Sequence, residues 1–265
     1  MISQFDGFVE SQGAKIHYLE KNRDAKAVSF LFVPGLMMPA WIFEKQLEYF
    51  SKDYRVVAID PRSQGESEQS SEGHYALSLA KDIKAVVDSL QLKPLVLIGW
   101  SLGVPEVINY AAHFGSKDLV GLVLIDGLTG IDPSLPFYQS TLEYWAQFQS
   151  DRIPMTRKFV RDIFAQPQTE EYLEKLTESA LRTPTNTVMT LIDNYLLQDF
   201  RSLLPRIEVP TLIATVDGPR LGYMQKMQSL LPNSRLEIIK SAGHTLFVDQ
   251  PDQFNHLLET FVKAL

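Results

Sequence analysis

The sequence contains no cysteine, and this absence removes several kinds of chemistry at once. A chain without thiols forms no disulfide, holds no thiolate zinc site or iron–sulfur cluster, and has no cysteine nucleophile. The absence does not decide the compartment, because a secreted enzyme can also lack cysteine.

Long apolar runs and clustered positive charge are also scarce. The longest apolar stretches are interrupted by proline and glycine and fall short of a membrane span. No basic segment followed by an apolar run stands at the N-terminus, so we expect no signal peptide and a cytoplasmic location. Lysine and arginine number 25 against 32 aspartates and glutamates, a net charge of −7, and they form no cluster. We therefore expect no nucleic-acid partner.

The 265 residues, 45% of them hydrophobic, are enough for a sizeable core. Short apolar, β-branched runs alternate with longer segments of helical periodicity, which indicates a mostly parallel sheet flanked by helices. The expected strands are Val28–Val33, Val56–Ile59, Leu95–Ile98, Leu119–Ile125, Thr211–Val216 and Leu236–Ile239. The expected helices are Ile42–Phe50, Tyr75–Leu90, Val104–Phe114, Gly222–Leu231 and Asp252–Ala264. Alternation around a turn-like Gln12-Gly13 predicts an antiparallel edge hairpin before them.

Residues 128–205 break the alternation. This stretch contains no convincing strand, and its helical segments are rich in aromatic residues and punctuated by prolines. We interpret it as a helical cap inserted over a core formed by residues 1–127 and 206–265. The alternative is an ordinary helical run within the same layer.

The most informative stretch runs from Leu95 to Gly103, where an apolar strand leads directly into Gly-Trp-Ser-Leu-Gly and then into a helical pattern. A G-x-S-x-G sequence between a strand and a helix predicts a tight turn that holds the hydroxyl of Ser101 out at the carboxyl end of the sheet. The N-terminus of the following helix favours negative charge that develops there.

A serine hydroxyl needs a base to accept its proton before it is an effective nucleophile. Among the five histidines, His244 stands apart because it follows the last expected strand and would lie at the same sheet edge as Ser101. Three of the others, His17, His113 and His256, are more typical of structural positions, and His74 lies in a polar loop before an expected helix.

With these pieces in place, most of the chain resembles the α/β-hydrolase superfamily, in its esterase, cofactor-free haloperoxidase-like and meta-cleavage-hydrolase-like branch. The segments that carry the resemblance appear in the family's order, and they are Val33–Gly35, Asp60–Ser67, Gly99–Gly103, Gly121–Asp126, Val209–Ile213 and Gly243–Pro251. The resemblance implies an eight-stranded, mostly parallel sheet, and residues 128–205 fall where the family inserts its cap. It also implies a Ser-His-acid triad that transfers an acyl group to water.

The oxyanion loop departs from the family pattern, because the usual His-Gly is Pro34-Gly35 here. The donors in such a site are backbone N–H groups, so Leu36 and Leu102 are the expected oxyanion donors despite this change.

The acid that orients His244 has two candidates. Asp126 ends the strand before the cap, where some branches of the family carry their acid. Asp217 follows the strand that begins near Pro210, but it comes earlier than the family's usual position and lacks the glycine that normally precedes it. We favour Asp126 and keep Asp217 as the alternative.

The expected pocket is mostly apolar, with Met37, Trp41 and Trp100 near the nucleophile and Trp145 from the cap. Such a lining favours an uncharged ester, lactone or related carbonyl compound as the small-molecule substrate. No phosphate-binding loop and no metal-binding motif is present, so we expect neither a metal nor another cofactor.

The resemblance leaves other functions open. The same fold and triad serve cofactor-independent perhydrolases or haloperoxidases, ring-cleaving dioxygenases and small-molecule receptors. The dioxygenases carry a histidine after the nucleophile, whereas this chain has Leu102 there and no histidine in the segment Leu36–Ala40. We therefore favour a carboxylic ester hydrolase.

Overall fold

The structure is a computed structural model that describes residues 3–115, 117–130 and 136–265. Its centre is an eight-stranded sheet in the order β1-β2-β4-β3-β5-β6-β7-β8. The strands are β1 (Gln4–Ser11), β2 (Ala14–Lys21), β3 (Ser29–Val33), β4 (Arg55–Ile59), β5 (Leu95–Trp100), β6 (Leu119–Ile125), β7 (Thr211–Thr215) and β8 (Ser234–Ile238). β1 and β2 form an antiparallel hairpin that continues antiparallel onto β4, and all the other pairs are parallel. The predicted fold class is confirmed, and the edge hairpin turns at Gln12-Gly13 as expected.

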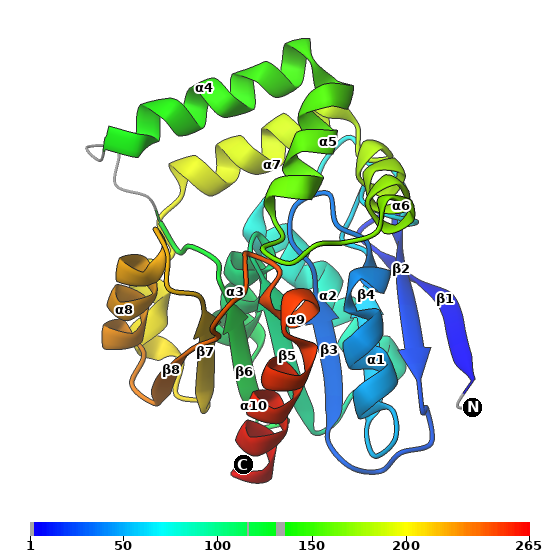
Figure 1. The fold of residues 1–265 in the computed structure, drawn as a ribbon. Helices are drawn as coiled ribbons and strands as arrows, with labels where there is room; N and C mark the ends of the chain where they lie inside the picture. Colours follow the sequence, from blue (N-terminus) through cyan, green and yellow to red (C-terminus); the bar gives the residue numbers. More distant parts are fainter. Residues whose placement is uncertain (1–2, 116, 131–135) are drawn as a thin grey trace.

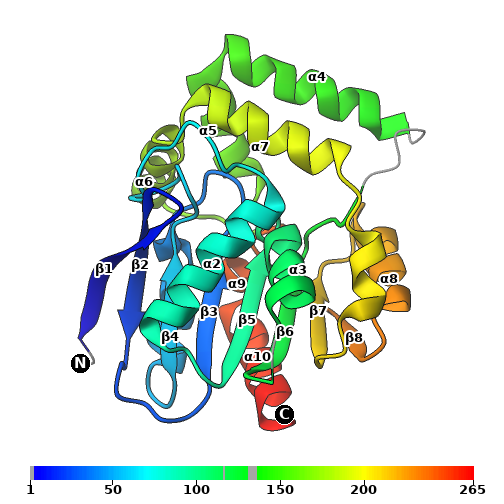
Figure 2. The same cartoon turned by 180° about the vertical axis from the view of Figure 1, so that it is seen from behind.

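Helices cover both faces of this sheet (Figures 1 and 2). One face carries α1 (Glu44–Phe50), α9 (Leu246–Asp249) and α10 (Pro251–Lys263), and the other carries α2 (Ala76–Leu90), α3 (Gly103–Phe114) and α8 (Leu221–Leu230). Successive residues of a strand point to opposite faces, so Phe30 and Phe32 of β3 pack with the first group while Leu31 and Val33 pack with the second. Burial on both sides explains why the parallel strands are continuous apolar runs.

A second group of helices stands above the carboxyl ends of the parallel strands (Figure 1). It consists of α4 (Pro136–Ser150), α5 (Arg152–Asp162), α6 (Glu170–Leu181) and α7 (Thr185–Leu197), and a 3₁₀ segment, η2 (Arg201–Arg206), leads back to the sheet. A 3₁₀ turn, η1 (Ala40–Phe43), precedes α1. The four helices occupy the stretch expected to form the cap, of which residues 131–135 lie outside the described residues. No helix in the described ranges has the length and apolar character needed to cross a membrane.

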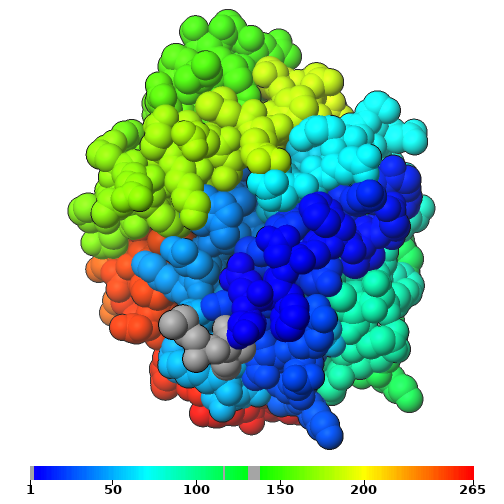
Figure 3. Space-filling view, turned by 90° about the vertical axis from the view of Figure 1, so that its right-hand side faces the viewer, coloured from blue at the N-terminus to red at the C-terminus, as the bar shows by residue number. Residues whose placement is uncertain are grey.

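The upper helices are joined to the core by packing and by polar contacts. Their buried apolar residues belong to the same hydrophobic cluster as Leu36, Met37 and Trp100. Arg182 forms an ion pair with Glu66 at 2.6 Å, and the side-chain amide of Asn194 donates to the carbonyl of His74. In Figure 3 these helices, green to yellow, adjoin the cyan part of the chain beside the dark blue hairpin.

Candidate active site

Ser101 and Asp126 each stand at the first position after neighbouring strands, β5 and β6. The backbone N–H of Ser101 donates to the carbonyl of Ile125, and that of Asp126 donates to the carbonyl of Ala214. Both residues have positive φ angles, 56° and 41°, in the left-handed region that non-glycine residues rarely adopt. Backbone strain of this kind is concentrated at functional sites.

Two glycines permit these turns to pack closely. A Cβ atom on Gly103 would lie 2.5 Å from the carbonyl oxygen of Val33, and one on Gly127 would lie 2.3 Å from the carbonyl oxygen of Ser101. Neither position therefore accepts a side chain. The turn after β6 is thus pressed directly against the turn that carries the serine.

His244 connects the two strand ends. Its Nε2 lies 2.9 Å from the Oγ of Ser101, and its Nδ1 lies 2.6 Å from Oδ2 of Asp126. Of the two candidate acids, the structure thus brings Asp126 to the histidine. Asp217 is exposed and makes no hydrogen bond to His244 within the described part of the chain.

The loop that carries His244 is held from below and from above. The indole N–H of Trp100 donates to the carbonyl of His244 at 2.8 Å. The carbonyl of Ile163, just after α5, accepts hydrogen bonds from both the backbone N–H and the hydroxyl of Thr245. Asp249 accepts from the backbone N–H groups of Gly243 and Ala165. The imidazole is therefore oriented by a loop anchored to both the sheet and the upper helices.

Two further side chains, those of Thr215 and Arg220, contact Asp126. Neither was predicted from the sequence. The hydroxyl of Thr215 donates to Oδ1 at 2.6 Å, and Nη1 of Arg220 lies 3.2 Å from Oδ2 and 3.4 Å from Nδ1 of His244. Thr215 had a detectable signal, because it is a polar residue at the carboxyl end of a buried parallel strand. Arg220 follows a loop whose path the sequence does not reveal.

The charges around Asp126 and His244 shift the pKa values of both residues. Burial alone would raise the pKa of Asp126, but the hydrogen bond and charge of His244, together with Arg220 and Thr215, lower it. Burial and the nearby charge of Arg220 lower the pKa of His244 below its ordinary 6.5, against the opposing effect of Asp126. Near pH 7 the imidazole is therefore neutral and able to accept a proton.

A cavity of about 520 Å³ opens above Ser101 and His244, between the sheet and the upper helices. Its lining is mostly apolar and aromatic, with Leu36, Leu102, Leu128, Tyr144, Trp145, Phe159, Ile192, Tyr195, Leu196 and Tyr223 among its residues. Leu36 and Leu102 have backbone N–H groups that donate to no protein acceptor within the described ranges. The expected oxyanion donors thus lie beside the serine with their N–H groups unused.

Only one of the four predicted pocket residues lines this cavity, namely Trp145. Met37 and Trp100 are fully buried, with the sulfur of Met37 against Arg152 of α5 and Trp100 packed on Phe43 and Phe247. The ring of Trp41 lies edge-on to that of Tyr172. The prediction failed for these three because a position next to Ser101, or just after the oxyanion loop, does not decide which way a side chain points.

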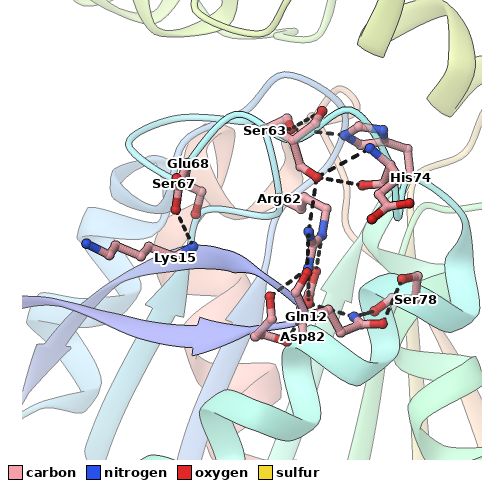
Figure 4. Close-up of polar contacts among 12 residues, drawn as sticks. Gln12, Lys15, Arg62, Ser63, Ser67, Glu68, His74, Ser78 and Asp82 are labelled. Carbon is pink, nitrogen blue, oxygen red and sulfur yellow. Dashed lines mark hydrogen bonds and ion pairs between the residues drawn. The ribbon is translucent and has the colours of Figure 1, made fainter.

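The segment 60–67 positions the oxyanion loop rather than contacting the cavity. Asp60 accepts a hydrogen bond from the backbone N–H of Ala40, and the side-chain oxygen of Gln64 accepts one from the backbone N–H of Met37. Arg62 is anchored below by a two-bond ion pair with Asp82 on α2 (Figure 4). No group of three or more His, Asp or Glu side chains in the described ranges is arranged to hold a metal ion.

The model of the alpha/beta hydrolase family matches residues 30–257. The chain belongs to that family. Among its curated relatives, a non-heme chloroperoxidase from Streptomyces lividans is 28% identical over 277 aligned positions, covering 96% of this chain and 98% of the relative. 3-Oxoadipate enol-lactonase 2 from Acinetobacter baylyi is 26% identical, covering 99% and 98%.

Solved structures show the same fold for this hydrolase. A bromoperoxidase from Bacillus anthracis superimposes with a TM-score of 0.90 at 21% identity, covering 98% of this chain and all of the other. An esterase from Exiguobacterium antarcticum gives a TM-score of 0.88 at 22% identity, with the same coverage. The chain is therefore an α/β-hydrolase enzyme related to esterases, enol-lactonases and non-heme haloperoxidases.

Proposed function

We propose that this hydrolase cleaves small carboxylic esters or lactones with a mostly apolar body, through an acyl-enzyme formed on Ser101. The observation that carries the proposal is the hydrogen-bonded row Ser101–His244–Asp126 at the floor of an apolar cavity. The expected domain division, with a cap at residues 128–205 closing this cavity, is part of the same proposal.

In this mechanism the Oγ of Ser101 attacks the carbonyl carbon while Nε2 of His244 takes its proton. Asp126 holds the other ring nitrogen, so that Nε2 is the accepting atom, and stabilises the imidazolium that forms. The N–H groups of Leu36 and Leu102 receive the oxyanion, and each such donor contributes about 3–4 kcal/mol to transition-state stabilisation. His244 then protonates the departing alkoxide, and water activated by the same histidine releases the acid.

The test is release of p-nitrophenol from acetate and butyrate esters by the wild type and by Ser101→Ala. We expect the variant to lose about 10⁴-fold or more in kcat. The matched control is Ser229→Ala, which removes a serine hydroxyl from an exposed position on α8, outside the cavity lining. An inactive wild type, or turnover that survives Ser101→Ala, would refute the proposal.

Hydrogen peroxide is a second candidate acceptor of the acyl group. One relative that aligns over 96% of this chain carries the name non-heme chloroperoxidase, and this name favours it. Peroxide would attack the acyl-enzyme in place of water, releasing a peroxy acid and the free serine. The measurement is peroxy-acid formation during ester turnover in added peroxide. Its absence under conditions where the ester is consumed would restrict the enzyme to hydrolysis.

A further inference from the structure

Arg220 is the cation nearest to the proposed catalytic row. It directly precedes α8, lines the cavity together with Ser101 and His244, and keeps 44% of its side chain exposed. Neither the esterase mechanism nor the family resemblance requires a guanidinium group at this position.

The contact between Arg220 and Asp126 leaves most of the guanidinium unused. Asp126 already accepts two hydrogen bonds at 2.6 Å, from His244 and Thr215, while Nη1 of Arg220 stands farther away at 3.2 Å. The Nε and Nη2 groups of Arg220 have no hydrogen-bond partner in the described ranges. A planar guanidinium presents five N–H donors in a geometry that matches a carboxylate.

The other charges of the cavity leave this cation available to a ligand. The side chain of Asp126 is fully buried and lies behind His244. Asp162, the one acid in the described lining, is exposed and forms an ion pair with Lys158 one turn earlier on α5. Apart from Arg220 and Asp162, the described lining is apolar or uncharged, and it includes the neutral imidazole of His244.

We propose that Arg220 binds an anionic group of the substrate, so that the preferred substrates are esters or lactones that also carry a carboxylate. This inference rests on the proposed hydrolase function and narrows its substrate class. It modifies the sequence-based expectation of an uncharged substrate, which was drawn without Arg220 in the cavity.

Binding of a carboxylate there would also assist the chemical step. Arg220 stands 3.4 Å from Nδ1 of His244, and a positive charge so close opposes the imidazolium that forms when Ser101 loses its proton. A substrate carboxylate on the guanidinium offsets that charge. The preference for an anionic substrate is therefore expected in kcat as well as in KM.

Two matched pairs of esters test this proposal, one for each end of the substrate. One pair carries the charge on the acyl side, the mono-p-nitrophenyl ester of adipic acid and its methyl ester. The other carries it on the leaving group, 4-acetoxybenzoate and its methyl ester. For each pair the quantity is the ratio of kcat/KM for the anionic ester to that for the neutral ester, which cancels general damage to the site.

In Arg220→Gln we expect this ratio to fall at least about 5-fold below the wild-type value for one pair or both. Arg157→Gln is the matched control, since it removes the same charge from an exposed ion pair with Glu174 on α5 and α6, outside the cavity lining. The control should keep the wild-type ratio. Ratios within 2-fold of the wild type in Arg220→Gln, for both pairs, would overturn the proposal.

A measurement on the wild type keeps the test valid should Arg220→Gln fold poorly. Adipate should inhibit turnover of p-nitrophenyl butyrate competitively, and the uncharged adipamide should inhibit at least about 5-fold more weakly. Equal inhibition by the two compounds, or none by adipate, would contradict the carboxylate site. Either result leaves intact the proposed ester hydrolysis, which is tested separately by Ser101→Ala.

Discussion

His244 and His17 are two histidines with nearly the same carboxylate contact and opposite electrostatics. Nδ1 of His244 lies 2.6 Å from Asp126, and Nδ1 of His17 lies 2.7 Å from Asp60. The difference is on the other ring nitrogen, which faces the hydroxyl of Ser101 in His244 and a second carboxylate, Asp6, in His17.

The surrounding charges decide what each ring can do. For His17, burial favours the neutral ring, but the two carboxylates outweigh it and raise the pKa above 6.5. For His244, burial and Arg220 prevail over one carboxylate and lower the pKa. The two carboxylates therefore favour the charged form of His17, which joins the hairpin to Asp60, whereas His244 is favoured in the neutral form that can accept a proton. A His–Asp hydrogen bond alone does not identify a catalytic pair.

The largest expected effect separates the acid of the proposed row from its exposed rival. Asp126→Asn should lower kcat by about 10⁴-fold, because an amide in place of the carboxylate favours the wrong imidazole tautomer and leaves the imidazolium without a counter-ion. Asp217→Asn should stay within about 2-fold of the wild type, since surface changes away from a site have small effects. Steady-state kinetics with p-nitrophenyl butyrate measure both. A loss confined to Asp217→Asn would assign the role to the other acid.

The second effect concerns stability rather than activity. His17→Gln should lower the free energy of unfolding by about 3 kcal/mol, because Asp60 then stays buried without its cation. Urea titration measures this change, and His113→Gln, at an exposed position on α3, is the control. A destabilisation no greater than that of the control would show that His17 is not the charged partner described above.

The same variant has a pH signature. Because the pKa of His17 is raised in the folded state, its stabilising contribution is complete below pH 6.5 and is lost as the pH rises through that higher pKa. Urea unfolding at pH 6 and at pH 9 should show a loss of stability in the wild type that is smaller in His17→Gln. Identical pH dependence in the two proteins would contradict this assignment.

The smallest effect is a shift in the pH profile of turnover. Because the pKa of His244 is lowered from 6.5, the acidic limb of kcat/KM for a neutral ester should have its midpoint below pH 6.5. Removing the charge in Arg220→Gln should move the acidic limb to higher pH, whereas Arg157→Gln should leave it in place. A limb that moves to lower pH in Arg220→Gln would reverse the assigned effect of Arg220.

Much of the fold was predictable because the parallel strands are buried on both faces, and their sequences are therefore continuous apolar runs. Strand β6 has the predicted bounds, Leu119–Ile125. Edge strand β8 begins at Ser234, two residues before the predicted start, because its first residues are polar and only half-buried. The four-residue helix α9 was missed, since its apolar sequence is too short to show a helical period.

The site was predictable where backbone geometry fixes a residue and unpredictable where loops do. Ser101 and Asp126 occupy strained turns at strand ends, and the flanking glycines and apolar runs in the sequence predict such turns. The contact of Arg220 with Asp126 joins residues 94 positions apart in the sequence and depends on the path of an irregular loop. The upper face of the cavity likewise depends on how α4, α5 and α7 pack, which helical periodicity does not specify.

The most direct test of the central claim, that His244 and Asp126 activate Ser101, is covalent labelling with a fluorophosphonate followed by peptide mass spectrometry. We expect one adduct, on the peptide that contains Ser101, forming at least 100-fold more slowly in Asp126→Asn, about 3 kcal/mol in the barrier. Labelling of Ser63 beside His74, or labelling of Ser101 at an unchanged rate in Asp126→Asn, would contradict it.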